Sequence, residues 1–209
     1  KLTRRAVYIG AADFMPFWKG FPPLDLVVHE MGHALDWPHS STSVDNFGSG
    51  VYDSKVDVMS DSAAPRNLNP DERNAPGPLA INMYLAQWLD DRNVAVVEKG
   101  TKSFNLVATK TDLAVDGLRL VLVPVDNSTV ISIEVLEATG DNQHLLHDRV
   151  VIHHIDVAGE AGFERRQTVI AADLQGDDSW SDGNVEITVK QVMRTNSVAT
   201  ASIEVRIGS

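Results

Sequence analysis

The 209-residue chain contains no cysteine, which excludes a disulfide framework, thiolate metal ligands and thiol catalysis. Basic residues are also scarce, because 18 Lys and Arg stand against 29 Asp and Glu and leave a formal net charge of −11. Contacts to phosphate need clustered Lys and Arg, so we expect no nucleic-acid partner. No apolar run approaches the length that spans a bilayer, so we expect no membrane span.

One short segment concentrates metal-ligating side chains. Residues 29–39 read His-Glu-Met-Gly-His-Ala-Leu-Asp-Trp-Pro-His, with three imidazoles and one carboxylate. On a helix, His29 and His33 lie four positions apart on one face and can hold a single zinc ion. Glu30 lies about a hundred degrees further round the helix, beside that ion, where a general base belongs.

A third ligand requires the helix to stop in time. Pro38 cannot continue a helix and disfavours helical geometry at Trp37, while Asp36 tolerates the left-handed turn that ends many helices. We therefore predict that His39 returns to the same ion as His29 and His33. Three protein ligands leave one position open for water, as in catalytic zinc sites.

These residues resemble the signature of the metzincin metalloendopeptidases, in which a glycine stands where this chain has Asp36. Met59, in Val56-Asp57-Val58-Met59-Ser60, is similar to the methionine of the metzincin Met-turn, an apolar floor below the metal. Some metzincins carry a tyrosine two positions later, but Asp61 stands here, which leaves Tyr52 as a candidate for oxyanion stabilisation. The resemblance implies a secreted zinc endopeptidase that acts on polypeptides.

The resemblance also implies that strands precede the zinc helix, yet only 28 residues stand before His29. Residues 5–9 are predicted as one strand. We therefore expect either a missing N-terminal segment, supplied by a longer precursor or a second chain, or a reduced fold.

The fold class predicted is α+β, with a metzincin-like zinc-helix region over residues 1–92 and an all-β sandwich over residues 93–209. Residues 40–77 are rich in Ser, Asp, Asn, Gly and Pro and are predicted as mostly loop, followed by a helix over 78–90. Alternating β-branched segments then predict seven strands. These cover residues 103–109, 118–125, 129–136, 149–157, 167–174, 184–192 and 199–207.

The tail is similar in pattern to the region after the catalytic domain in gametolysin-like and immune-inhibitor-A-like bacterial peptidases. The similarity is carried by residues 150–156 and by Trp180 before the strand at 183–189. The similarity does not distinguish these peptidases from serralysin-like and other bacterial metzincins.

The other histidines and the acidic clusters carry weaker signals. His144 and His147 are three apart in a loop, and His153 and His154 point to opposite faces of a strand. Structural calcium could bind Asp177, Asp178 and Asp182, or Asp45, Asp53 and Asp57, but the spacing favours solvated loops.

Two alternatives remain open at this point. Glu72 could replace His39 as third ligand, as in the gluzincins. Alternatively, the first region could be a catalytically silent metal-binding fragment, with the sandwich acting in adhesion or carbohydrate binding through Phe104, Phe163 or Trp180.

Overall fold

The computed structural model describes residues 24–42, 54–60, 76–110, 115–156 and 168–208. This part of the chain is mostly β, with two sheets and few, short helices. Its helical segments are α1 (Leu24–Ala34), α2 (Ala80–Leu85) and the 3-10 turns η4 (Asp91–Asn93) and η5 (Gly140–Asn142). None of the described helices is long and apolar enough to cross a membrane.

The first sheet, sheet A, has the strand order β1-β7-β6-β5-β4-β2. Its strands are β1 (Ser40–Ser41), β2 (Val94–Val96), β4 (Leu120–Pro124), β5 (Thr129–Leu136), β6 (Arg149–Asp156) and β7 (Thr168–Leu174). The central four strands are antiparallel neighbours, while β1 and β2 join the two edges in parallel. Sheet A therefore includes a short strand that follows directly after His39.

The second sheet, sheet B, has the order β3-β10-β9-β8 and is antiparallel throughout. Its strands are β3 (Gly100–Val107), β8 (Ser179–Asp182), β9 (Val185–Thr195) and β10 (Val198–Ile207). All seven predicted strands are present, the one over 129–136 with its predicted bounds and the others with shifted ends, while β2 was not predicted. The strand β8 was not predicted, because the sequence Ser-Trp-Ser-Asp has no apolar alternation.

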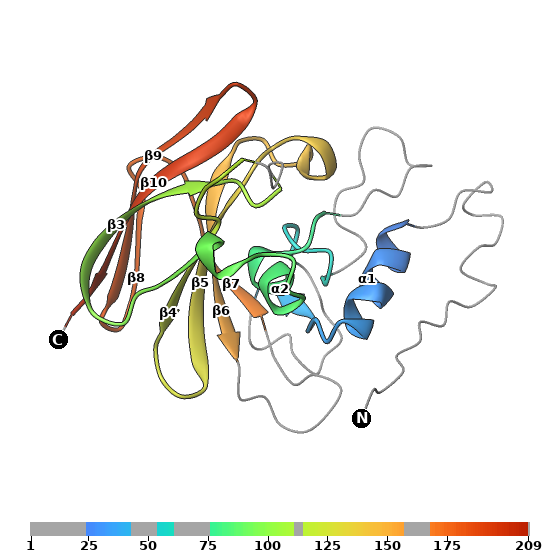
Figure 1. Cartoon of the computed structure of the whole chain (residues 1–209), viewed down its shortest axis with the longest axis horizontal. Helices are drawn as coiled ribbons and strands as arrows, with labels where there is room; N and C mark the ends of the chain where they lie inside the picture. Colours follow the sequence, from blue (N-terminus) through green and yellow to red (C-terminus); the bar gives the residue numbers. More distant parts are fainter. Residues whose placement is uncertain (1–23, 43–53, 61–75, 111–114, 157–167, 209) are drawn as a thin grey trace.

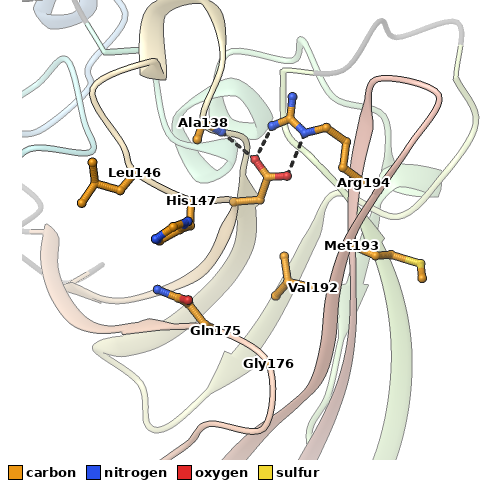
Figure 2. Close-up of a pocket in the computed structure, with 9 residues that line it drawn as sticks. Ala138, Leu146, His147, Gln175, Gly176, Val192, Met193 and Arg194 are labelled. Carbon is orange, nitrogen blue, oxygen red and sulfur yellow. Dashed lines mark hydrogen bonds and ion pairs between the residues drawn. The ribbon is translucent and has the colours of Figure 1, made fainter.

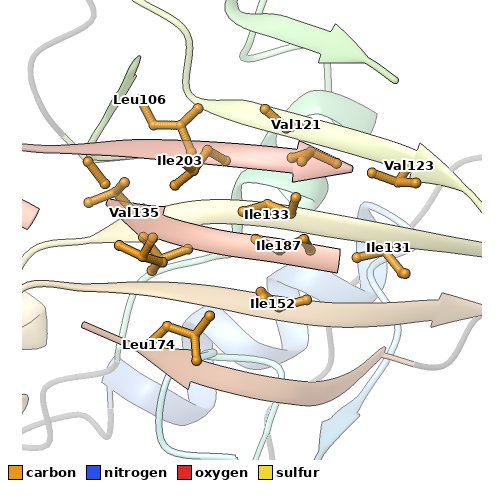
Figure 3. Close-up of a cluster of buried hydrophobic side chains, with 14 of the residues drawn as sticks. Leu106, Val121, Val123, Ile131, Ile133, Val135, Ile152, Leu174, Ile187 and Ile203 are labelled. Atoms are coloured by element: carbon orange, nitrogen blue, oxygen red, sulfur yellow. The ribbon is translucent and has the colours of Figure 1, made fainter. Parts of the chain in front are cut away.

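The two sheets lie face to face and enclose the main core (Figure 1). Alternate residues of each strand point inward, so Ile131 and Ile133 of β5 meet Ile187 of β9 and Ile203 of β10 (Figure 3). All four side chains are fully buried. The β-sandwich expected for the C-terminal part is therefore present.

The outer face of sheet A is covered by the N-terminal part of the chain. Leu79, Ala80 and Ile81, at the start of α2, form a second apolar cluster with Leu120 of β4 and Ile155 of β6. Figure 1 shows α2 beside sheet A and α1 on the far side of α2 from the sandwich. The layers thus run from sheet B through sheet A to α2 and α1. The division into domains 1–92 and 93–209 stays a prediction.

Two predictions about the N-terminal part need correction. The helix predicted over 78–90 covers only Ala80–Leu85, because Gln87 adopts a left-handed φ of 61°. The amides of Gln87 and Trp88 then bond back to the carbonyls of Tyr84 and Met83, which closes the helix end. In the segment predicted as loop, Ser40 and Ser41 form β1. The strand predicted at residues 5–9 lies outside the described residues.

Candidate metal centre

The helix α1 carries His29 and His33 one turn apart, as the sequence predicts. Gly32 lies on the adjoining face, where the helix backbone approaches the side chains of Met59 and Trp37. A Cβ atom at Gly32 would lie 2.2 Å from Met59 Sδ and 2.7 Å from Trp37 Cε3. Glycine at this position therefore allows the helix to lie directly on the methionine.

The end of α1 confirms the predicted turn at Asp36. Asp36 has a φ of 63°, and its amide bonds to the His33 carbonyl at 3.1 Å. The Trp37 amide reaches back to the Gly32 carbonyl at 3.0 Å, which completes the two-bond closure of a helix end. Aspartate thus takes the left-handed conformation in which a glycine would be unstrained.

The reversed chain brings His39 back to the helix. The Nε2 atoms of His29 and His33 are 3.1 Å apart, and His39 Nε2 lies 2.9 Å from His33 Nε2 and 3.2 Å from His29 Nε2. Just after His39, the Ser40 amide bonds to the Met59 carbonyl at 3.1 Å. The predicted three-histidine group is therefore formed in the structure.

Backbone carbonyls set the orientation of two of the rings. His29 Nδ1 donates to the Val58 carbonyl at 2.9 Å, and His33 Nδ1 donates to the Trp37 carbonyl at 3.1 Å. A carbonyl can only accept, so each Nδ1 carries a proton, and the neutral ring leaves its Nε2 lone pair available. Histidines that ligate metals are commonly held in this way by their second nitrogen.

The three converging nitrogens suit a cation. With its proton on Nδ1, a neutral imidazole offers only a lone pair at Nε2, and such nitrogens 3.1 Å apart, as in His29 and His33, can share a cation between them. A tetrahedral zinc ion with Zn–N distances of about 2.0–2.1 Å separates its nitrogen ligands by roughly 3.3–3.4 Å. The observed spacing is close to that value. Among the described residues, these three histidines are the one group of three or more His, Asp or Glu side chains that could hold a metal ion.

Met59 lies in a turn and is fully buried. It forms a small apolar cluster with Trp37 and Val58, against which Val28 of α1 packs. Met59 thus packs against α1, and its role as the apolar floor of a metal site stays a prediction.

Two buried carboxyl groups lie behind this turn. Asp57 Oδ1 accepts the Met59 amide at 3.1 Å, and both oxygens of Glu134, on β5, accept the Ala80 amide at 2.9 and 3.0 Å. Burial raises the pKa of Asp57 to about 7, against the opposing hydrogen bond from Met59. Burial likewise raises the pKa of Glu134 to about 8, and the nearby Asp57 charge adds to this rise. Both groups are therefore largely protonated below neutral pH.

Sequence reasoning did not identify Glu134 or the two ring-orienting carbonyls. Glu134 lies on the face of β5 opposite to Ile131 and Ile133, where a glutamate would ordinarily mark a solvated position, yet it is fully buried. Every residue has a backbone carbonyl, so no sequence pattern indicates which carbonyls orient the histidine rings. Asp57 was noted only as a loop acid, although its place two residues before Met59 is typical of a side chain that accepts a turn amide.

The catalytic candidate Glu30 lies next to His29 on α1 and is half-buried. Its role as a general base stays a prediction. Tyr52, Asp61 and Glu72 lie outside the described residues, as do Asp45 and Asp53.

The remaining candidates make other contacts. His144 Nε2 lies 2.7 Å from the Lys55 carbonyl. His153 is fully buried, while His154 faces β8, 3.3 Å from Asp182 Oδ2. Asp178 Oδ2 accepts the Gln175 amide at 2.8 Å. The two histidines on β6 thus point to opposite faces, and calcium binding stays a prediction.

The sandwich also carries an open pocket of about 450 Å³, whose lining does not include the three histidines. Figure 2 shows the residues that line it. Asp148 lies in the wall of this pocket, and its partial burial raises its pKa. Hydrogen bonds from Arg194 and from the Ala138 amide have the opposite effect. These bonds outweigh burial, so the pKa of Asp148 is below its usual value. Arg194 and Asp148 neutralise each other, so this pocket presents no unpaired charge from that pair.

Comparison of the chain with known protein families, with curated protein sequences and with solved structures finds no match.

Proposed function

We propose that this chain is a zinc-dependent endopeptidase of the metzincin type, with zinc held by His29, His33 and His39. The observation that carries the proposal is the convergence of three Nε2 atoms within 3.2 Å of one another. The ion would supply Lewis acidity, which polarises a carbonyl and makes water acidic enough to lose a proton near neutral pH. Three protein ligands also leave one position open, which favours a catalytic role over a structural one.

Glu30 is assigned the proton transfers. It follows a ligand by one residue, so its carboxylate lies beside the ligand face of α1 and not on it. In this position it takes a proton from the attacking water and later gives one to the leaving amine. The carboxylate therefore acts first as a base and then as an acid.

The proposed substrates are extended polypeptides, bound by main-chain pairing to an edge strand. A secreted location and a bacterial source are implied by the resemblance to metzincins, and they form part of the proposal. A further N-terminal segment or a second chain could complete the substrate cleft.

The structure favours His39 over Glu72 as third ligand, because His39 Nε2 already lies within 3.2 Å of both other ligand atoms. The alternative of a silent adhesion module needs exposed aromatic platforms on the sandwich. Phe104 and Trp180 instead pack against the edge of the sandwich core, and Phe163 lies outside the described residues. The described residues therefore offer this alternative little support.

The direct test is cleavage of an unfolded protein such as casein by the zinc-loaded chain, beside Glu30→Gln and Glu30→Ala. We expect cleavage by the parent and a loss of at least a hundredfold in both variants, the lower end of what a positioned acid or base contributes. All three proteins should retain one zinc per chain. Equal cleavage by parent and variants, or none by the zinc-loaded parent, would contradict the proposal.

A further inference from the structure

The carbonyl that orients His29 is itself held from two sides. Val58 accepts the His29 ring proton at 2.9 Å, and the Val58 amide donates to the Gly77 carbonyl at 3.3 Å. The Gly77 amide in turn reaches the side-chain oxygen of Asn142 at 3.4 Å. Asn142 belongs to η5, between β5 and β6, and is buried. A continuous chain of hydrogen bonds therefore runs from His29 to the sandwich.

Glu134 fixes the same segment a few residues further on. Both of its oxygens accept the Ala80 amide, and Oε2 also accepts the Thr109 hydroxyl at 2.6 Å. The amide of Ala80 lies in the first turn of α2, where no residue of that helix can accept it. Glu134 thus supplies the partner that this buried amide needs, and it ties residues 77–80 to β5.

Apolar packing supports the same connection. Val56, just before the Met59 turn, is buried with Leu136 of β5, Val151 of β6 and Leu145. The His144 ring contacts the Lys55 carbonyl beside it. Residues 55–58 therefore lie on the sandwich and not only on α1.

We infer that Glu134 and Asn142 are positioning residues of the metal centre, and that sheet A forms a structural half of it. Neither residue touches the histidines. Each holds residues 77–80, which hold Val58, whose carbonyl sets the ring of His29. The inference rests on the proposed function, since it requires metal binding at His29, His33 and His39.

Glutamine is a close mimic of Glu134 in its folded environment. The raised pKa keeps this side chain largely neutral at pH 7, and the amide of glutamine retains an oxygen that can accept from Ala80. The Thr109 hydroxyl can rotate to accept from the new NH₂ group. Glu134→Gln should therefore preserve the connection, whereas Glu134→Ala removes it.

The test compares the full-length parent with Glu134→Gln, Glu134→Ala and Asn142→Ala. Zinc affinity is measured by competition with a chromophoric chelator, the ligand field by the visible spectrum of the cobalt(II) form, and the His29 tautomer by NMR of the metal-free chain. Ile131→Val, in the sandwich core, is the control for a general loss of stability, because its side chain points away from this connection.

We expect the alanine variants to lose about tenfold or more in zinc affinity, as is usual for residues outside the ligand shell. The cobalt spectrum should change and the Nδ1–H signal of His29 should weaken. Glu134→Gln and Ile131→Val should stay within about threefold of the parent. If Glu134→Ala does not fold, Asn142→Ala and Glu134→Gln carry the comparison.

The inference is overturned if the parent binds zinc, His33→Ala does not, and Asn142→Ala and Glu134→Ala bind as tightly as the parent. An equal loss in Ile131→Val would also overturn it, since stability alone would then explain the result. If His33→Ala binds zinc like the parent, the proposed function fails and the inference falls with it.

Discussion

The sandwich and the metal-binding region, which comprises residues 24–42, 54–60 and 76–93, are stabilised in different ways. The sandwich has a large apolar core between two sheets, to which β3, β4, β5, β6, β9 and β10 contribute buried Val, Ile or Leu side chains. The metal-binding region, so named for its three candidate ligands, has only small apolar clusters. Its segments attach to sheet A through these clusters and through single buried polar groups such as Glu134 and Asn142. From this comparison we expect a one-way dependence, in which the candidate metal centre needs the sandwich.

The largest effect on stability is expected from a substitution in the sandwich core. Ile133→Ala removes a fully buried side chain of β5 and should lower the free energy of unfolding by about 2–5 kcal/mol. Because the metal-binding region lies on the other face of the same sheet, it should unfold in urea no later than the sandwich. Fluorescence of Trp37 is followed in a background in which Trp18, Trp88 and Trp180 are replaced by Phe. Its urea midpoint should not exceed the midpoint from far-UV circular dichroism, and a higher Trp37 midpoint would contradict the dependence.

A smaller effect is expected inside the metal-binding region itself. Gly32→Ala places a methyl group against Met59 and Trp37, an overpacking that typically costs about 1–3 kcal/mol. Zinc affinity should fall as well, since the helix carrying His29 and His33 must shift. Gly176→Ala is the control, because the nearest atoms to its new Cβ are 3.8 Å away. Similar effects from both substitutions would show that the contact below α1 is not tight.

Two buried acids lie where the metal-binding region meets sheet A, and they predict that the free energy of unfolding depends on pH. The folded state raises the pKa of Glu134 from 4.5 to about 8 and that of Asp57 from 3.8 to about 7. Between about pH 4 and pH 8 the folded chain therefore binds more protons than the unfolded chain, and stability from these groups is lost as pH rises. Lys110 opposes the shift at Glu134.

Glu134→Gln should remove the part of this loss that Glu134 causes. Between pH 5 and pH 8, the free energy of unfolding of the variant should therefore rise relative to that of the parent by up to a few kcal/mol. Urea unfolding at the two pH values measures the difference. Parallel pH profiles for parent and variant would contradict a neutral, buried Glu134.

The smallest effect concerns the end of α1. Asp36 has a φ of 63°, which glycine adopts without strain, so Asp36→Gly should stabilise the chain by about 0.5–1 kcal/mol. Asp36→Ala should be neutral or destabilising. Thermal unfolding of the three proteins provides the comparison, and a destabilised glycine variant would mean that the Asp36 side chain contributes more than its backbone strain costs.

The two regions also differ in how far the sequence predicts them. Alternating apolar residues locate the seven predicted strands, because each strand buries one face against the other sheet. The three histidines and the turn at Asp36 are local features, and the structure has them as predicted. The attachment of residues 54–60 and 76–80 to sheet A is non-local and combines small apolar clusters with single polar groups. Glu134 has the sequence signature of a solvated residue, so no pattern within the chain predicts its contact with Ala80.

The end of α2 shows a related limit. Leu85, Trp88 and Leu89 continue an apolar pattern past the point where the helix stops. Gln87 ends the helix by adopting a left-handed conformation, which is rare for glutamine. No pattern in the neighbouring sequence predicts this conformation. Backbone conformations imposed by tertiary packing are therefore the part of this fold that sequence reasoning misses.

The most direct measurement of the central claim is X-ray absorption at the zinc edge, on the parent loaded with one zinc per chain and on His39→Ala. The account predicts three imidazole nitrogens and one further light atom at about 2.0–2.1 Å in the parent, with one imidazole lost in the variant. A parent that retains no zinc, or a spectrum unchanged by His39→Ala, would contradict the three-histidine centre on which the proposed peptidase depends.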